Sequence, residues 1–181
     1  MRHLPNLISV LRIALVWPIM ASIMQGHYRL TLGLFFLAAV SDALDGFLAK
    51  RFRWTSELGK YLDPIADKLL LMSVFVLLTW YGLIPPWLTI MAIGRDVLIG
   101  LGAIVYRMVW GELRGRPMIT SKINTLLQLL YVLAVIARET FQSPGPDVLQ
   151  ALAWLTMISI CVSGVLYVRE FTQRALAVAR A

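Results

Sequence analysis

The chain has 181 residues, of which 59% are hydrophobic and 15% are charged, and its formal net charge is +7. Soluble domains carry about 25% charged residues, so this composition excludes a soluble globular protein. It predicts an integral membrane protein, with one domain over residues 1–181. The single cysteine, Cys161, excludes an internal disulfide and provides no set of thiolates for a metal site.

Six apolar stretches are long enough to cross a bilayer, which takes about 20 residues. Turn-forming and charged segments separate them, and no internal repeat of 20–50 residues is visible. We therefore predict an all-α bundle of six transmembrane helices. The predicted spans are residues 6–24, 30–50, 61–81, 86–108, 118–137 and 147–168.

The distribution of basic residues predicts how the chain is oriented. Of the 17 Lys and Arg residues, 13 belong to the two ends of the chain and to the loops on the same side as those ends. The alternate loops contain only Arg29 and Arg138. Because cytoplasmic segments are enriched in Lys and Arg, both termini are expected in the cytoplasm.

Four of the ten acidic residues lie within one stretch of 26 residues: Asp42, Asp45, Asp63 and Asp67. The first two are spaced i, i+3 and the last two i, i+4, so each pair occupies one face of its helix. A short loop joins the two helices, which predicts that they are antiparallel neighbours. The four carboxylates then converge slightly below the cytoplasmic surface.

Converging carboxylates repel one another unless protons or cations neutralise them. Oxygen ligands favour hard divalent ions, so we expect Mg²⁺ or Mn²⁺. Four carboxylates can bridge two such ions about 3.5–4 Å apart, as phosphoryl-transfer sites do. The two histidines, His3 and His27, are remote from the acids in sequence, which argues against zinc.

The stretch "DALDGFLAKRFRWTSELGKYLDPIAD" resembles the signature of the CDP-alcohol phosphatidyltransferases, D-x-x-D-G-x-x-A-R-x8-G-x3-D-x3-D. The spacing is intact, and one fixed position differs, because Lys50 stands where the family has Arg. The resemblance implies an enzyme that transfers a phosphatidyl group from CDP-diacylglycerol to an alcohol and releases CMP. It also implies two bound metal ions.

The same resemblance implies a role for each matching residue. Asp42, Asp45, Asp63 and Asp67 are the implied metal ligands, and Asp67 is also the implied catalytic base. "PNLISVLR" resembles the opening of the family, and we expect loop contacts from Ser56. The expected CDP-lipid contacts are Asn6, Ser9, Gly46, Ala49, Lys50, Ser56 and Gly59.

Several of these residues have a simpler reading that the sequence leaves open. Lys50 is either a phosphate contact or an interfacial lysine whose ammonium reaches the headgroups. Gly46 either clears space for a nucleotide or allows tight helix packing. Asn6, Ser9 and Arg12 either close the nucleotide pocket or cap and anchor the first helix.

Two later segments bear on the acceptor alcohol. Arg95 in "GRDVLI" and Lys122 in "SKINTLLQ" are the predicted acceptor-binding residues. Both segments are more similar to the cardiolipin synthases of the family, which implies phosphatidylglycerol as the acceptor. Glycerol 3-phosphate is the alternative. Arg95 can instead pair with Asp96 or with the acid cluster, and Lys122 can instead reach the headgroup region.

A proton- or ion-coupled transporter is a competing class, because transporters also place carboxylates inside a helix bundle. It predicts acids near the midplane and broken helices in related halves, which this sequence lacks. We further expect no nucleic-acid partner, a bacterial inner (cytoplasmic) membrane location with the active site facing the cytoplasm, and a homodimer. Small residues such as Gly100, Gly102 and Ser163 could line a helix interface.

Overall fold

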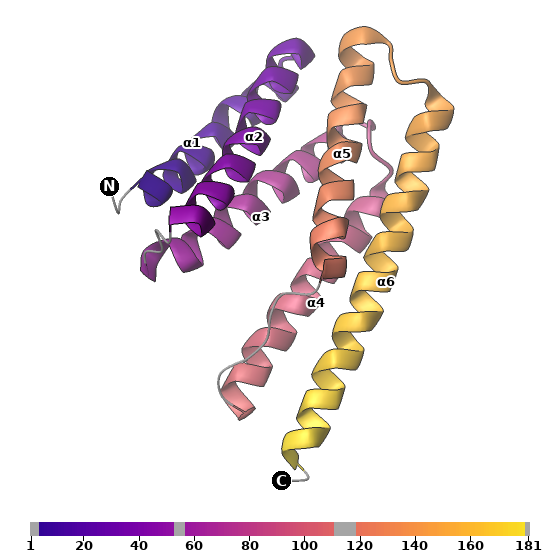
Figure 1. Cartoon of the computed structure of the whole chain (residues 1–181). Helices are drawn as coiled ribbons and strands as arrows, with labels where there is room; N and C mark the ends of the chain where they lie inside the picture. Colours follow the sequence, from indigo (N-terminus) through magenta and orange to yellow (C-terminus); the bar gives the residue numbers. More distant parts are fainter. Residues whose placement is uncertain (1–3, 53–56, 111–118, 180–181) are drawn as a thin grey trace. The chain divides into compact units, whose positions relative to one another are not determined.

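A computed structural model describes the backbone of residues 4–52, 57–110 and 119–179. It describes the side chains of residues 10–42, 66, 68–106, 108–109 and 119–174. These parts of the chain form six α-helices (Figure 1). The helices are α1 Leu4–Met24, α2 Tyr28–Phe52, α3 Glu57–Trp80, α4 Pro86–Trp110, α5 Ile119–Phe141 and α6 Pro146–Ala179.

In the described residues, the predicted all-α class and the presence of six helices are confirmed. Within the described residues, three helices are long and apolar enough to cross a membrane: Pro86–Tyr106, Ile119–Phe141 and Pro146–Arg174. Helix α6 continues well beyond the predicted end at residue 168. It does so because a helix can persist after its apolar stretch, and here Arg174 pairs with Glu170 one turn earlier.

The chain divides into two compact units. The first contains residues 1–84 and 132–145, and therefore α1, α2, α3 and the end of α5. In this unit α1 packs against both α2 and α3 (Figure 1). Its buried core includes Ile19 and Ile23 of α1, Phe35 of α2, and Phe75 and Leu78 of α3.

Polar contacts and tight turns also order the first unit. The buried hydroxyls of Ser22 and Thr31 share a hydrogen bond of 2.8 Å between α1 and α2. Gly26 follows α1 with φ of 70°, and Gly82 follows α3 with φ of 73°. Glycine adopts this left-handed conformation without a Cβ clash and commonly ends helices in this way.

The second unit contains residues 85–131 and 146–181, and therefore α4, the first part of α5, and α6. Here α4 packs along α6. The ring centroids of Trp87 and Trp154 lie 5.6 Å apart at one end of this helix pair. Toward its other end, Phe171 of α6 stacks with Tyr106 of α4.

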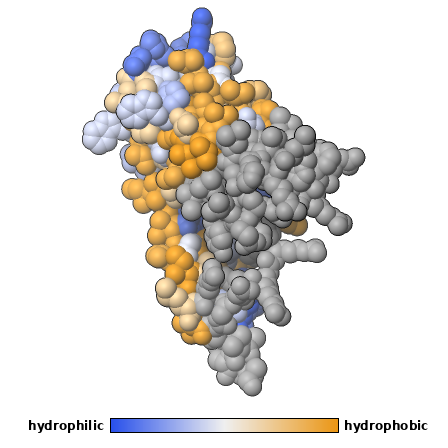
Figure 2. All heavy atoms as spheres, turned by 90° about the vertical axis from the view of Figure 1, so that its left-hand side faces the viewer, coloured by the Kyte–Doolittle hydropathy of each residue, from blue (hydrophilic) through white to orange (hydrophobic). Residues whose placement is uncertain are grey.

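Large apolar side chains are exposed in both units. Trp17, Phe36 and Val76 are more than 40% exposed in the first, as are Ile104 and Ile158 in the second. Figure 2 shows apolar atoms over much of the described surface on one face. Soluble monomers rarely expose apolar patches of more than a few hundred Å², so this surface suits contact with lipid.

Candidate functional site

The two acidic pairs occupy the helix ends that flank residues 53–56. Asp42 and Asp45 lie on the last three turns of α2, and Asp63 and Asp67 on the first three turns of α3. At about 1.5 Å of rise per residue, Asp42 lies about 15 Å from the end of α2, and Asp67 about 15 Å from the start of α3. Asp45 and Asp63 likewise match, at about 10 Å and 9 Å. The backbone therefore gives both pairs corresponding depths on successive helices.

Asp42 is the one member of this acid cluster whose side chain the structure describes. Its Oδ1 lies 2.8 Å from Nη2 of Arg12 on α1, and the two side chains form an ion pair. The Arg12 side chain is 2% exposed, whereas that of Asp42 is 46% exposed. A buried guanidinium thus positions a carboxylate that remains open on its other side.

One described carboxylate, that of Asp42, belongs to the predicted metal site. Asp42 offers an accessible oxygen ligand, which fits a hard divalent cation. The side chains of Asp45, Asp63 and Asp67 lie outside the described part, as do those of Asn6, Ser9, Gly46, Ala49, Lys50, Ser56 and Gly59. Among the described side chains, no three acidic, His or Cys residues gather into a metal-binding group.

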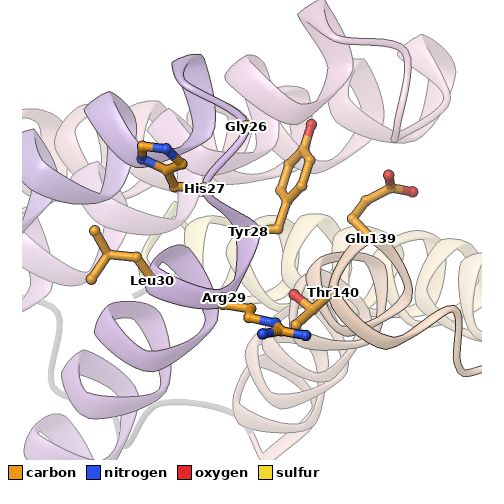
Figure 3. A pocket seen from close by; sticks show the side chains of 7 residues that line it. All are labelled: Gly26, His27, Tyr28, Arg29, Leu30, Glu139 and Thr140. Carbon is orange, nitrogen blue, oxygen red and sulfur yellow. The ribbon is translucent and has the colours of Figure 1, made fainter.

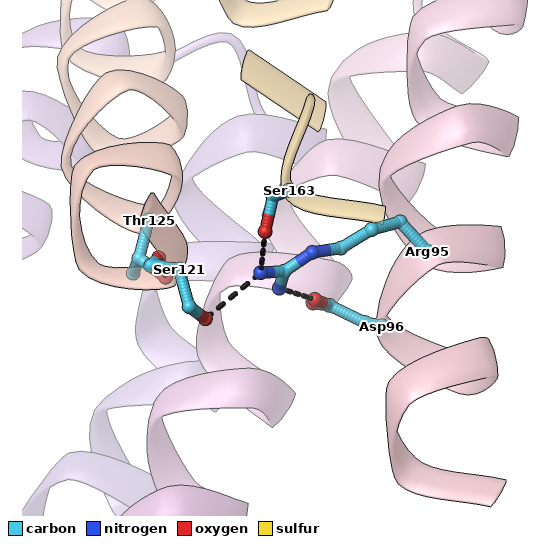
Figure 4. A network of polar contacts seen from close by, with 5 residues as sticks. All are labelled: Arg95, Asp96, Ser121, Thr125 and Ser163. Carbon is cyan, nitrogen blue, oxygen red and sulfur yellow. Dashed lines mark hydrogen bonds and ion pairs between the residues drawn. The ribbon is translucent and has the colours of Figure 1, made fainter. Parts of the chain in front are cut away.

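Arg95 is the centre of a polar network in the second unit (Figure 4). Its Nη1 donates to Asp96 Oδ1 at 2.6 Å. Its Nη2 donates to Ser121 of α5 at 2.8 Å and to Ser163 of α6 at 2.5 Å. The guanidinium also lies 5.7 Å from the centroid of the Tyr167 ring, within the range of a cation–π interaction.

This network joins three helices through one cation. Arg95 pairs with Asp96, the partner that the sequence analysis gave as an alternative to acceptor binding. The buried Nε atom of Arg95 has no hydrogen-bond partner among the described residues. Ser121 is an α5 residue that contacts Arg95. Lys122 is exposed and lies about 100° around the helix from Ser121.

Sequence reasoning missed three contacts of these networks. They are the ion pair of Arg12 with Asp42 and the hydrogen bonds from Arg95 to Ser121 and Ser163. The available signal was the presence of Arg12 and Arg95 inside apolar runs, because an intramembrane Arg requires polar partners. Ser163 is buried inside the chain against Arg95, and Gly102 faces Phe171 of the same chain.

A hollow of about 480 Å³ lies in the first unit, at the connection between α1 and α2. Figure 3 shows Tyr28 and Arg29 on α2 beside Glu139 and Thr140 near the end of α5. Partial burial and then the negative charge of Glu139 raise the pKa of the Tyr28 phenol above its ordinary value of 10.0. The hollow is at the opposite end of α2 from Asp42 and Asp45, so it is separate from the acid cluster.

Comparison with known proteins identifies the family of the chain. The family model of the CDP-alcohol phosphatidyltransferases matches residues 2–171. The chain is 34% identical to a cardiolipin synthase (CMP-forming) of Homo sapiens, over 91% of this chain and 60% of the relative. It is 31% identical to a CDP-diacylglycerol–glycerol-3-phosphate 3-phosphatidyltransferase of Bacillus subtilis, over 91% of this chain and 92% of the relative.

A chloroplastic CDP-diacylglycerol–glycerol-3-phosphate 3-phosphatidyltransferase 1 of Oryza sativa is 31% identical, over 94% of this chain and 57% of the relative. The chain thus spans less than two thirds of the human and rice relatives, and nearly the whole bacterial one. The family match contains the complete acidic motif of residues 42–67. This chain belongs to the CDP-alcohol phosphatidyltransferase family.

Proposed function

We propose that this protein is an enzyme of membrane phospholipid synthesis that transfers a phosphatidyl group from CDP-diacylglycerol to an alcohol, releasing CMP. The observation that carries this proposal is the intact acidic motif inside a family match that covers residues 2–171. The corresponding depths of the two acidic pairs on α2 and α3 support it. A transporter does not need an acid–glycine motif next to a basic loop.

The proposed residues divide the chemistry between them. Asp67 accepts the proton of the acceptor hydroxyl, the hydroxyl oxygen forms a bond to the β-phosphorus, and the bond from that phosphorus to CMP breaks. CMP departs with the bonding electrons. Asn6, Ser9, Gly46, Ala49, Lys50, Ser56 and Gly59 contact the CDP-lipid. General-base help of this kind typically contributes about 10²–10⁴-fold in rate.

Asp42, Asp45, Asp63 and Asp67 are the residues proposed to hold two Mg²⁺ or Mn²⁺ ions. Such ions supply positive charge that neutralises a pyrophosphate and a departing phosphate. The Arg12 contact supports this role for Asp42, because it orients the carboxylate and leaves nearly half of that side chain accessible. Positioned carboxylates bind metal more readily than carboxylates that must first be ordered.

For the acceptor we propose phosphatidylglycerol, with glycerol 3-phosphate as the alternative. The relatives include a cardiolipin synthase and glycerol-3-phosphate phosphatidyltransferases at similar identity. The segments "GRDVLI" and "SKINTLLQ" favour the first. Arg95 and Lys122 are the proposed acceptor-binding residues, with Arg95 at the junction of α4, α5 and α6.

We place the enzyme in a bacterial inner (cytoplasmic) membrane with six spans, cytoplasmic termini and a cytoplasm-facing site. The asymmetric distribution of Lys and Arg supports this orientation, and the exposed apolar side chains support the lipid environment. We also propose a homodimer. Gly102 and Ser163 contact Phe171 and Arg95 of the same chain, so we propose Gly100, which has nothing within 4 Å of a built Cβ, as a small residue of its interface.

The decisive test is CMP release by purified protein supplied with CDP-diacylglycerol and Mg²⁺ or Mn²⁺. We expect release only when phosphatidylglycerol or glycerol 3-phosphate is also present, and none after chelation of the metal. Asp67→Asn should lower the rate by about 10²-fold or more, whereas Asp147→Asn, an exposed acid at the start of α6, should not. Full activity in Asp67→Asn would disprove the base assignment, and no CMP release with either acceptor would disprove the function.

A further inference from the structure

The hollow at the connection between α1 and α2 belongs entirely to the first unit and carries charges of both signs. Its volume of about 480 Å³ lies in the range of small-ligand sites. Arg29 of α2 and Glu139 of α5 line it, together with Tyr28 and Thr140. Because the hollow is at the opposite end of α2 from the acid cluster, the proposed catalytic residues do not account for it.

Hydrogen bonds hold the backbone on both sides of the hollow. On one side, the His27 amide donates to Ser22 O at 2.9 Å and the Thr31 amide donates to His27 O at 3.0 Å, so that α1 leads directly into α2. On the other side, Nη1 of Arg138 donates to Pro144 O at 3.0 Å. Side chains on an ordered backbone bind a ligand with a smaller loss of conformational entropy.

Arg29 and Glu139, whose side chains the structure describes, do not pair with each other. Neither of them forms an ion pair with any other described residue. Figure 3 shows the Arg29 guanidinium extending toward Thr140, whereas the Glu139 carboxylate extends on the side of the Tyr28 ring. The negative charge of Glu139 contributes to the raised pKa of Tyr28, which agrees with that placement. The hollow therefore presents a positive and a negative group at separate positions.

This separation of charges selects a zwitterionic ligand. A guanidinium donates to the oxygens of a phosphate, and a carboxylate accepts hydrogen bonds from a primary ammonium. An anionic ligand would use the guanidinium alone and would meet the carboxylate as a like charge. A quaternary ammonium has no N–H to donate. A phosphoethanolamine group, in which an ethylene unit joins a phosphate to a primary ammonium, matches both groups.

The residues around the hollow favour a lipid over a soluble molecule. Leu30 lines the hollow and is exposed, so it offers apolar surface to an acyl chain. Trp80 ends α3 and Tyr81 follows it, and both are exposed. The Tyr81 phenol donates to Met24 O at 3.5 Å, so these aromatic residues lie at the same end of the first unit as the hollow. Trp and Tyr gather at the level of the lipid headgroups.

We infer that this hollow binds the phosphoethanolamine headgroup of a phospholipid. Arg29 contacts the phosphate and Glu139 contacts the ammonium, while Leu30 packs against the start of an acyl chain. The site uses neither the acids nor the acceptor of the proposed reaction, so it can fail without the proposed function failing.

The experiment compares three dioleoyl lipids on the purified protein in detergent: phosphatidylethanolamine, phosphatidylcholine and phosphatidylglycerol. Native mass spectrometry measures the dissociation constant of each. We expect the wild type to bind phosphatidylethanolamine about fivefold more tightly than either other lipid, which is the upper range for one partly exposed ion pair. Soluble glycerophosphoethanolamine, which lacks acyl chains, should bind more weakly than the lipid by about tenfold or more.

Two variants separate the roles of the charges. Glu139→Gln should abolish the preference for phosphatidylethanolamine over phosphatidylcholine, whereas Arg29→Gln should weaken the binding of both and keep their ratio. The ratio is measured within each variant, so a smaller fraction of folded protein cancels. Asp147→Asn and Arg169→Gln remove exposed charges outside the hollow, and these matched controls should bind all three lipids as the wild type does.

Three results would overturn the inference: equal binding of the three lipids, an unchanged preference in Glu139→Gln, and phosphatidylglycerol binding as tight as that of phosphatidylethanolamine. Soluble glycerophosphoethanolamine that binds as tightly as the lipid would overturn the lipid assignment and identify a soluble zwitterion instead. CMP release by the same wild-type preparation tests the proposed function separately, because none of these binding results depends on it.

Discussion

Arg12 and Asp42 show how a single contact joins the proposed site to the helix core. The guanidinium is 2% exposed and the carboxylate is 46% exposed, so the pair lies between the interior of the first unit and its surroundings. Exposed ion pairs contribute about 0.2–1 kcal/mol, and buried ones are more costly to break. The pair should therefore contribute modestly to stability while fixing the direction of a proposed metal ligand.

A double-mutant cycle tests this pair. We expect Arg12→Gln and Asp42→Asn each to lower the free energy of unfolding in detergent with chelator present, and the double variant to lose about 1 kcal/mol less than the sum. Arg12 makes further contacts, so Arg12→Gln alone should cost more than this coupling. A parallel cycle of Arg12→Gln with the exposed Asp147→Asn should be additive; non-additivity there, or additivity for the pair, contradicts the interpretation.

At the residue scale, the sequence supplied the types and spacing of the functional residues but not their side-chain partners. The acidic motif, Arg95 and the small residues could all be identified in the amino-acid sequence. Spacing places residues on a shared face, but each helix can still rotate about its own axis against its neighbours. That rotation decides that Ser121 rather than Lys122 contacts Arg95, and no local pattern encodes it.

Gly102 allows a close approach of α4 to Phe171 of α6. A Cβ built on Gly102 would lie 2.7 Å from Cε2 of Phe171, a ring that also packs near Tyr106 and Tyr167. Gly100, on the same helix, has nothing within 4 Å of such a Cβ. Alanine substitutions at these two positions therefore distinguish the effect of packing from the intrinsic helix preference of alanine.

We expect Gly102→Ala to destabilise the protein by about 1–3 kcal/mol, because the aromatic ring must move. Gly100→Ala should be neutral or stabilise by up to about 1 kcal/mol, since alanine favours the helix more than glycine does. Thermal unfolding in the same detergent measures both. Equal effects at the two positions would show that Gly102 does not set the approach of α6.

Helix boundaries were predictable where composition changes sharply. Gly82 and Pro85 lie between α3 and α4, Pro86 begins α4, and the predicted start of that span at residue 86 agrees with the structure. The end of α6 was not predictable from apolarity, because pairs such as Glu170–Arg174 support a helix beyond its apolar stretch. Hydropathy reports burial in lipid, whereas helix length also follows local propensity and charge pairing.

At the scale of the whole molecule, orientation in the membrane decides which substrates can reach the acids. The proposed topology places the connection between α1 and α2 on the side opposite the end of α6. Gln25 and Gln173 are exposed residues in these two regions, and Cys161 is the one native cysteine. Cysteine substitutions at these positions in a Cys161→Ser background therefore report the two sides independently.

In sealed vesicles with the original outer face outward, a membrane-impermeant maleimide should label Gln25→Cys and leave Gln173→Cys unlabelled. Both should react once detergent opens the vesicles, which controls for accessibility. The reason is the excess of Lys and Arg on the side that carries both termini. Labelling of Gln173→Cys in sealed vesicles would reverse the orientation, and labelling of both would require an even number of crossings between them. Either result would place the acidic motif away from cytoplasmic CDP-lipid or break the six-span arrangement.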